Sequence, residues 1–576
     1  MKRLLTFHRC LACALAIAAT FAAHAATYTK LDNTNSLDSA ASWGGPTPGG
    51  TDIARWAGAY SGGPATGVVT NSLYAIFAAG STPTWGGINV GAVTGSSLTQ
   101  SPIFNTTTSV SNITAATEAV VNGFNVVTIT CNASHRFENG QSVTISGVTP
   151  AGYNGTFIIA GVPSATQFTY TNAAGSLAAA APAGLVTATA AANMYIGGSG
   201  TGNGTLTIGA SGITVASGAP GVVINDASTA FSGGQTWNLA AGTLVRFAVG
   251  GTAATGKAVT SGADGLIEIT GSGTVSLNEG GASGFSDAAG FTGFTGNWQV
   301  DNGATLRGLR NGSTAFGTGS ITLNGGTLAV GGMSGDVGNW TWNTPVNLNS
   351  GTTSYLSEQN VAGSGRSLLL SGSISGSGNI VFTEPLVGAT TFTSQDLGFV
   401  LSGSDTMTGT VTIGGPVENG VAGRLSYVRV GGNATGTATT LGAGANGSLG
   451  SATAVVDNGV LTFTLTGGYS LPCTISGTGS LRIGSLNSAT GTGGYVGDAY
   501  QNITLTGANT YSGPTIINAG TLTLSAGSSL ANSSSINHRH QQCECRGRHQ
   551  HLRCVRSLGC FHDRFRSDPE PQWRPA

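Results

Sequence analysis

The sequence predicts an all-β solenoid, in which short strands wind into stacked turns. A strand–turn–strand unit at residues 505–524 recurs along the chain in degenerate form. Gly accounts for 94 of 576 residues and charged residues for 8%, without a collagen-like period. Apolar residues make up 40% of the chain and fall in alternating runs such as VVTIT at 126–130, which argues against disorder.

The clearest copy of the unit reads LTGANTYSGPTIINAGTLTL. Residues 506–509 and 518–520 predict turns, because Gly and Asn adopt positive φ at little cost. Residues 515–517 suit a strand, and residues 521–524 alternate polar and apolar side chains with period 2. A unit this short cannot bury its own apolar face, so it must stack on copies of itself.

Degenerate copies of both halves of the unit are present. Residues 401–413, LSGSDTMTGTVTI, repeat the first half. The phrase LSGSISGSG at 370–378 is similar to CTISGTGSL at 473–481. The second half, a turn followed by Thr-Leu or a similar pair, recurs at 203–206, 302–306, 324–328 and 458–461.

At these residues the chain resembles the autotransporter-associated β-strand repeat family. The resemblance is closest at 505–524 and covers about 190–530. It implies a secreted, right-handed parallel β-helix that is displayed on a Gram-negative cell surface or passed across the outer membrane. It implies no catalytic residues, and such repeats also occur in large surface proteins that lack a translocator barrel.

Residues 1–25 predict a secretory signal peptide. Three basic residues charge the first nine positions, residues 11–23 are apolar, and Ala-His-Ala at 23–25 fits the small-x-small cleavage rule. A membrane anchor is the alternative, but the apolar run is short for a spanning helix. We expect no membrane-spanning segment after removal of the signal.

Three segments follow the signal. Residues 26–112 predict an N-terminal segment that caps the first turn of the solenoid, with Trp43 and Trp56 as its cover; a sugar-binding pair is the alternative. Residues 113–189 predict a small inserted β-module, whose phrase ISGVTPAGYNGTF is similar to a short module of bacterial surface and phage proteins without known activity. Residues 190–537 predict the solenoid, at about 20–25 residues per turn.

The charge of the chain excludes two classes of partner. Residues 26–537 hold 11 Lys and Arg against 19 Asp and Glu, a net charge of −8, and no basic patch. Nucleic acids and anionic membrane surfaces are therefore not expected to bind.

Few residues suggest chemistry, and we predict no catalytic, cofactor-binding or metal-binding residues and no cofactor. The glycine-rich run 198–202 predicts a tight turn, because a nucleotide cradle needs a strand-to-helix context that is missing. Asp264 and Glu268 would share one face of a strand. A solvated face is the preferred interpretation of this pair, and acid–base work on a glycan is the alternative. Trp340 and Trp342 also alternate, which favours an aromatic stack on the solenoid or in its core over a sugar-stacking platform.

The last 39 residues, 538–576, differ in composition from the rest. A zinc site is one interpretation, but Cys-x-Cys and His-x-His fit structural zinc spacing poorly. A one-base frameshift explains the composition of the tail better than a zinc site does. It would turn many Arg, Cys, His and Gln codons into codons for the residue types, such as Gly, Ala, Ser, Thr and Asn, that dominate the rest of the chain. We therefore expect a disordered, out-of-frame tail on a truncated repeat protein. The Cys and His residues concerned are Cys543, Cys545, Cys554, Cys560, His538, His540, His549, His551 and His562.

The sequence as a whole predicts a secreted or cell-surface structural or adhesive solenoid without catalytic activity. A polysaccharide-binding or polysaccharide-degrading β-helix is the alternative. Extracellular glycans or other cell surfaces are the expected partners, and the oligomeric state is not predicted. The expected location is the extracellular space or outer surface of a Gram-negative-type bacterium, reached by export through the inner membrane.

Overall fold

The structure of the chain is a computed structural model. It describes residues 25–33, 35–60, 77, 80–94, 111–121, 124–132, 142–164, 166–173, 175–181, 187–190, 193–196, 204–224, 228–247, 259–261, 265–277, 291, 293–309, 316–332, 340–360, 368–383, 398–414, 427–432, 447–484, 502–538, 542–545 and 551–555.

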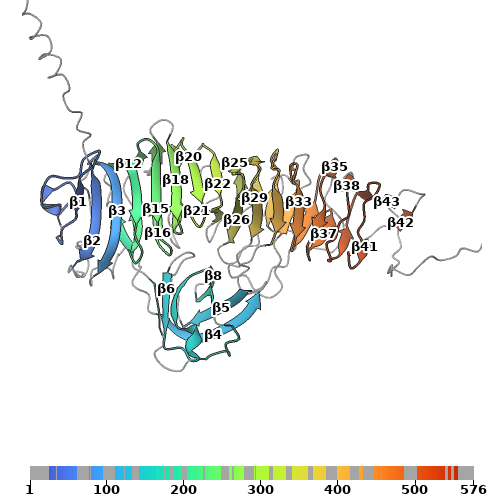
Figure 1. The fold of residues 1–576 in the computed structure, drawn as a ribbon, viewed down its shortest axis with the longest axis horizontal. Coiled ribbons are helices and arrows are strands. Elements are labelled where there is room, and N and C mark those ends of the chain that lie inside the picture. Colours follow the sequence, from blue (N-terminus) through green and yellow to red (C-terminus); the bar gives the residue numbers. More distant parts are fainter. Residues whose placement is uncertain are drawn as a thin grey trace, which may run out of the picture.

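The described residues form a β-solenoid with a separate antiparallel module, and the predicted all-β solenoid class is confirmed. Figure 1 shows the solenoid strands stacked in one row, with the module outside that row. Among the described residues, two short 3-10 helices, η1 (Ala40–Ser42) and η3 (Ala151–Tyr153), interrupt the strands. No helix within the described ranges is long and apolar enough to cross a membrane. The right-handed winding stays a prediction.

The longest sheet of the solenoid has 12 strands, and its neighbours pair in parallel. Its main path is β1 (Thr27–Thr29), β2 (Ile53–Ala59), β3 (Thr84–Thr94), β12 (Thr205–Val215), β15 (Gln235–Leu239), β18 (Leu266–Gly271), β20 (Asn297–Asp301), β22 (Ile321–Asn324), β25 (Val346–Leu348) and β28 (Ile374–Gly376); β14 (Ser228–Phe231) and β17 (Val259–Ser261) branch from β12.

A second parallel sheet of 11 strands forms another face of the solenoid. It comprises β11 (Asn193–Ile196), β13 (Gly221–Ile224), β16 (Leu244–Phe247), β19 (Thr274–Leu277), β21 (Thr305–Leu309), β23 (Thr327–Gly332), β26 (Thr353–Asn360), β29 (Asn379–Thr383), β31 (Thr410–Ile413), β33 (Ala454–Asp457) and β36 (Ile475–Ser476).

Two shorter sheets complete the C-terminal half. The first has eight parallel strands: β24 (Trp340–Trp342), β27 (Leu368–Leu370), β30 (Phe399–Leu401), β32 (Tyr427–Val430), β34 (Val460–Phe463), β37 (Ser480–Ile483), β39 (Thr515–Ile517) and β41 (Ile536–His538). The second has β35 (Gly468–Leu471), β38 (Asn502–Leu505) and β40 (Thr521–Leu524) in parallel, followed by the antiparallel strands β43 (His551–Val555) and β42 (Gln542–Cys545).

The module is a seven-stranded antiparallel sheet with its own core, which includes Ile129, Tyr153 and Phe168. It is inserted between neighbouring solenoid turns, because β3 pairs directly with β12 although the module lies between them in sequence. In sheet order its strands are β7 (Gly155–Ile158), β6 (Ser142–Ser146), β10 (Thr187–Ala190), β4 (Ser111–Val121), β5 (Phe124–Cys131), β9 (Gln167–Thr171) and β8 (Gly161–Ser164).

The turns of the solenoid vary in length more than the repeat pattern predicts. Asn502 pairs with Thr521, 19 positions later, whereas Thr410 pairs with Ala454, 44 positions later. The strand register is nevertheless kept in phase, so that inward residues stay inward from turn to turn. The extra length lies between strands, where it does not disturb the stack.

The first turns belong to the same stack as the rest. β1, β2 and β3 are the first three strands of the 12-stranded sheet. Inside them, Trp43, Trp56 and Trp85 pack against one another with ring centroids 5.6 to 5.9 Å apart. This aromatic cluster is part of the solenoid core, and its role as a cap stays a prediction.

Candidate functional site

The outer face of the 12-stranded sheet carries polar side chains in register. In β15 and β20, buried residues alternate with residues that reach solvent, as the period of a strand requires. Trp237 and Trp298 point into the core, where they are fully buried. On the opposite face Thr236 stands beside Glu268, and Glu268 stands beside Gln299.

These outward residues form one continuous hydrogen-bonded series, which we call the polar ladder. It crosses β15, β18, β20 and β22 and ends just after β25. Its members are Thr236, Glu268, Gln299, Asp301, Asn324 and Asn349.

Two carboxylates accept the hydrogen bonds at the centre of the polar ladder. Glu268 accepts from the Thr236 hydroxyl at 3.1 Å and from Gln299 Nε2 at 2.9 Å. The same Gln299 amide donates to Asp301 Oδ1 at 3.0 Å. Asn324 Nδ2 also donates to Asp301 Oδ1, at 2.9 Å, so both carboxylates are bound by neutral donors.

The 11-stranded sheet presents a different outer row. Arg246, Ser276 and Arg307 stand in register on β16, β19 and β21, and all three are buried. Arg307 Nε donates to Ser276 Oγ at 3.1 Å. Burial lowers the pKa of Arg246 to about 10 and that of Arg307 to about 9. Of these two rows, only the polar ladder reaches solvent.

The geometry of the polar ladder suits recognition of an extended polar polymer. Strand spacing repeats amide, hydroxyl and carboxylate groups at intervals of about 4.8 Å. Each group already holds a partner within the sheet, so the side chains are fixed in place before a ligand arrives. Glu268 and Asp301 are the only carboxylates in this hydrogen-bonded series, and both are half-buried.

The described residues do not include the predicted Asp264–Glu268 pair. Asp264 lies outside the described residues, and Glu268 is joined through Gln299 to Asp301 instead. Sequence spacing could not reveal this, because the partners are about one turn apart and turn length varies. Alignment of the turns on their buried tryptophans would also have failed, because Trp237 stands beside Ile269 whereas Trp298 stands beside Ile267.

The predicted tryptophan pairs do not form an exposed platform. Trp43 and Trp56 are buried, 5% and 0% exposed, which excludes them as an exposed sugar-binding pair. Trp342 is also buried, and its ring centroid lies 4.4 Å from that of Phe316. The side chain of Trp340 lies outside the described residues.

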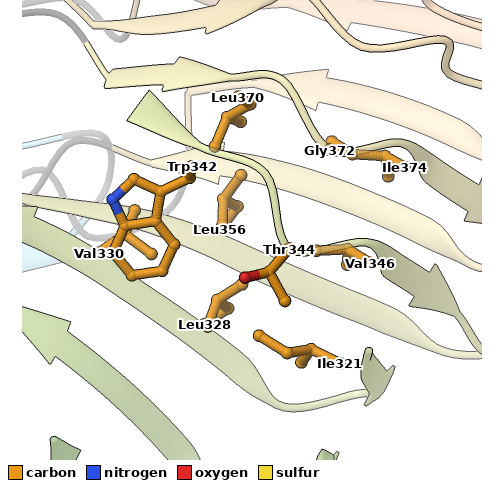
Figure 2. Close-up of a pocket in the computed structure, with 10 residues that line it drawn as sticks. All are labelled: Ile321, Leu328, Val330, Trp342, Thr344, Val346, Leu356, Leu370, Gly372 and Ile374. Atoms are coloured by element: carbon orange, nitrogen blue, oxygen red, sulfur yellow. The ribbon is translucent and has the colours of Figure 1, made fainter. Parts of the chain in front are cut away.

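Trp342 lines a small cavity inside the solenoid core. Figure 2 shows its indole among Val330, Leu356 and Leu370, with Thr344 as the polar group on the wall. The cavity measures about 20 Å³. Small-molecule pockets usually enclose about 300–1,000 Å³, so this space is a packing defect and not a ligand site.

The remaining candidates are placed only in part. The glycine-rich run 198–202 lies outside the described residues. In the tail, β42 and β43 pair with Cys543 opposite Cys554, and the side chains of these strands are not described. Within the described ranges, no three His, Cys, Asp or Glu side chains gather to hold a metal. Cys131 and Cys473 lie in the separate cores of the module and the solenoid.

Comparison with known proteins identifies the repeat. Residues 503–524 match the family described as passenger-associated-transport-repeat. The match confirms the resemblance seen at 505–524, and this kind of repeat implies an exported, surface-exposed protein. No curated protein and no solved structure shows significant similarity to the chain.

Proposed function

We propose that the chain is a surface-exposed, passenger-type β-solenoid that binds extracellular polysaccharide through the polar ladder. The observation that carries this proposal is the row of hydrogen-bonded side chains from Thr236 to Asn349, which is ordered and reaches solvent. A stiff solenoid with such a face is an adhesive scaffold: the apolar core fixes the spacing, and the outer row contacts the ligand.

The test is a glycan array probed with the full chain and with ladder variants. A Glu268→Ala and Gln299→Ala double variant removes the centre of the polar ladder without touching the core. We expect at least a tenfold loss of binding to any glycan retained by the unchanged chain. Binding that survives this change, or an array without any bound glycan, would overturn the proposal.

A matched pair of single variants controls for general surface effects. Thr322 stands beside Gln299 on the 12-stranded sheet, whereas Thr412 is a half-buried outward residue on β31 of the other long sheet. Thr322→Ala should weaken binding and Thr412→Ala should leave it unchanged. Equal effects of the two changes would point to a face other than the polar ladder.

Polysaccharide degradation is the second candidate, favoured by one observation. Glu268 and Asp301 accept hydrogen bonds from the same Gln299 nitrogen, so two carboxylates lie close together on an accessible face. Glycosidases use two carboxyl groups on either side of the scissile bond. Release of reducing ends from a bound glycan, abolished by Glu268→Gln, would establish this activity, and intact glycan after long incubation would exclude it.

A further inference from the structure

Two pairs of solenoid turns repeat the same contact with one chemical difference. Residues 401–413 and 505–517 align without gaps, so that Asp405 takes the position of Asn509. Each segment packs on an equivalent preceding turn. Thr406 N–H donates to Ile374 O at 2.9 Å, and Thr510 N–H donates to Ile475 O at 2.8 Å.

The side chains at the equivalent positions make the same bond to the preceding turn. The backbone N–H of Ile374 donates to Asp405 Oδ1 at 2.7 Å, and that of Ile475 donates to Asn509 Oδ1 at 2.9 Å. Both side chains are buried, with exposed fractions of 6% for Asp405 and 0% for Asn509. Each therefore ties one turn to the next through its first oxygen.

The two side chains differ in their second polar atom, which is Nδ2 in Asn509 and Oδ2 in Asp405. Asn509 Nδ2 donates to the carbonyl oxygens of Gly507 and Ser529, each at 3.2 Å. Asp405 Oδ2 is buried and has no hydrogen-bond partner among the described residues. An ionised carboxylate cannot donate, but a protonated carboxyl can donate one hydrogen bond while its other oxygen still accepts one.

We propose that Asp405 binds a proton in the folded chain and so acts as an amide substitute, which makes the contact between turns 370–378 and 398–414 sensitive to pH. Protonated Oδ2 supplies one donor at the place where Asn509 Nδ2 supplies two in the equivalent turn. Loss of the proton leaves a buried charge without that donor, and the turn then opens more often.

The surroundings of Asp405 favour the neutral form. Burial raises its pKa to about 7, and the backbone N–H groups of Ile374 and Ser448 act in the opposite direction. Tyr469 of β35 faces it, and burial raises the pKa of that phenol above its ordinary value, with Asp405 adding to the effect. Burial also raises the pKa of the neighbouring Cys473 thiol to about 11. Both neighbours stay neutral between pH 5 and 8, and among the described residues Asp405 is the group here that changes charge.

The sign of the pH effect follows from linkage. In the opened turn Asp405 releases its proton near its ordinary pKa, whereas the closed turn holds the proton up to about pH 7. The stabilisation is therefore complete at low pH, declines above about pH 4, and is lost as the pH rises through about 7.

Hydrogen–deuterium exchange of the full chain, followed by mass spectrometry, tests this directly. Peptides covering 398–414 and 502–518 are compared at pH 5 and pH 8, after correction for intrinsic exchange. As the pH rises from 5, we expect the protection of peptide 398–414 from exchange to fall relative to that of peptide 502–518. The fall is up to about tenfold per pH unit for one proton. An unchanged ratio between the two peptides would overturn the proposal.

Two reciprocal variants identify the residue responsible. Asp405→Asn should abolish the relative loss of protection at 398–414. Asn509→Asp should create the same loss at 502–518, with protection regained at pH 5. If Asp405→Asn keeps the pH dependence, or if Asn509→Asp shows none, the proton is held elsewhere and the proposal fails.

Discussion

Buried hydroxyl groups join neighbouring turns at the residues where the repeat is clearest. The phenol of Tyr511 lies 2.6 Å from Thr515 Oγ1, and that oxygen lies 2.9 Å from Ser533 Oγ of the following turn. Tyr511 and Thr515 are fully buried. Burial of such groups is tolerated because each one has a partner.

The Tyr511 hydroxyl should contribute measurably to stability. Tyr511→Phe removes the phenol oxygen and keeps the ring, so it should lower the free energy of unfolding by about 1 kcal/mol. Chemical denaturation measures this. Tyr355→Phe, which changes a half-buried tyrosine on β26, is the control and should have almost no effect. Equal effects of the two changes would contradict the role given to the buried network.

A second buried carboxyl makes stability depend on pH. Asp457 is the last residue of β33 and has no exposed surface. Burial raises its pKa to about 7, although hydrogen bonds from the N–H groups of Gly459 and Leu461 act to lower it. The folded chain holds this proton and the unfolded chain releases it near pH 4. The stabilisation is thus present at low pH and lost as the pH rises through about 7, by at most about 1.4 kcal/mol per pH unit.

The contribution of Asp457 can be isolated by substitution. Asp457→Asn should reduce the dependence of unfolding free energy on pH between pH 5 and 7.5, and Asp405 accounts for part of the dependence that remains. Asn324→Ala, a change on the half-exposed polar ladder that removes no titratable group, should leave that dependence as it is. A pH profile of the Asp457→Asn chain that matches the unchanged chain would refute the assignment.

At the scale of the element, glycines allow consecutive turns to lie close together. Gly477 follows β36 with φ of +105°, and a Cβ atom there would collide with the backbone oxygen of Asp457 in the preceding turn. Gly467, just before β35, has open space around its Cα. Glycine content thus has two causes in this chain, close stacking and simple turn formation.

Alanine substitution separates the two kinds of glycine. Gly477→Ala should lower the free energy of unfolding by about 1–3 kcal/mol, because it combines a collision with a positive φ. Gly467→Ala should change it by less than about 1 kcal/mol. Thermal unfolding of both variants checks the contrast, and a harmless Gly477→Ala would show that the turns are not in close contact there.

The apolar face of each strand is the other element-scale contribution. Leu356 on β26 is 2% exposed and borders the core cavity, whereas Leu266 on β18 is 41% exposed. Leu356→Ala should cost about 2–5 kcal/mol of unfolding free energy, and Leu266→Ala much less. Denaturant midpoints measure both, and similar losses would contradict the assignment of inward and outward faces.

Sequence patterns predicted the elements better than the site. Period-2 alternation and Asn-Gly turns identify strands such as β39 and β40 without ambiguity, since these signals are local. The polar ladder depends on which residues of different turns become neighbours, and insertions between strands hide this. Buried charge was also missed, because Asp405 lies in the polar segment LSGSDTMTG, which looks solvated in the sequence.

At the scale of the whole molecule, the module and the solenoid have separate sheets and separate cores. The module has its own antiparallel sheet and its own core, and β3 pairs with β12 across the point of insertion. Contacts within each unit therefore do not require the other. The solenoid core runs without a break from the N-terminal tryptophan cluster to β40.

Removal of the module tests this independence. Replacing residues 111–190 by a short Gly-Ser linker should leave the unfolding transition of the solenoid unchanged within about 1 kcal/mol. Circular dichroism at increasing denaturant measures the transition. A solenoid that loses its cooperative unfolding after this deletion would show that the module is part of its folding unit.

The proposed contact face for polysaccharide is the outward row of the 12-stranded sheet. Carbodiimide footprinting of carboxylates, with and without a polysaccharide retained by the full chain, tests it most directly. Glu268 and Asp301 should lose labelling when ligand is bound, while Asp32 and Asp38 near the N-terminus should keep theirs. Unlike the first two, these N-terminal carboxylates lie outside the polar ladder. Unchanged labelling of Glu268 and Asp301 in a saturated complex would show that the polar ladder is not the contact face.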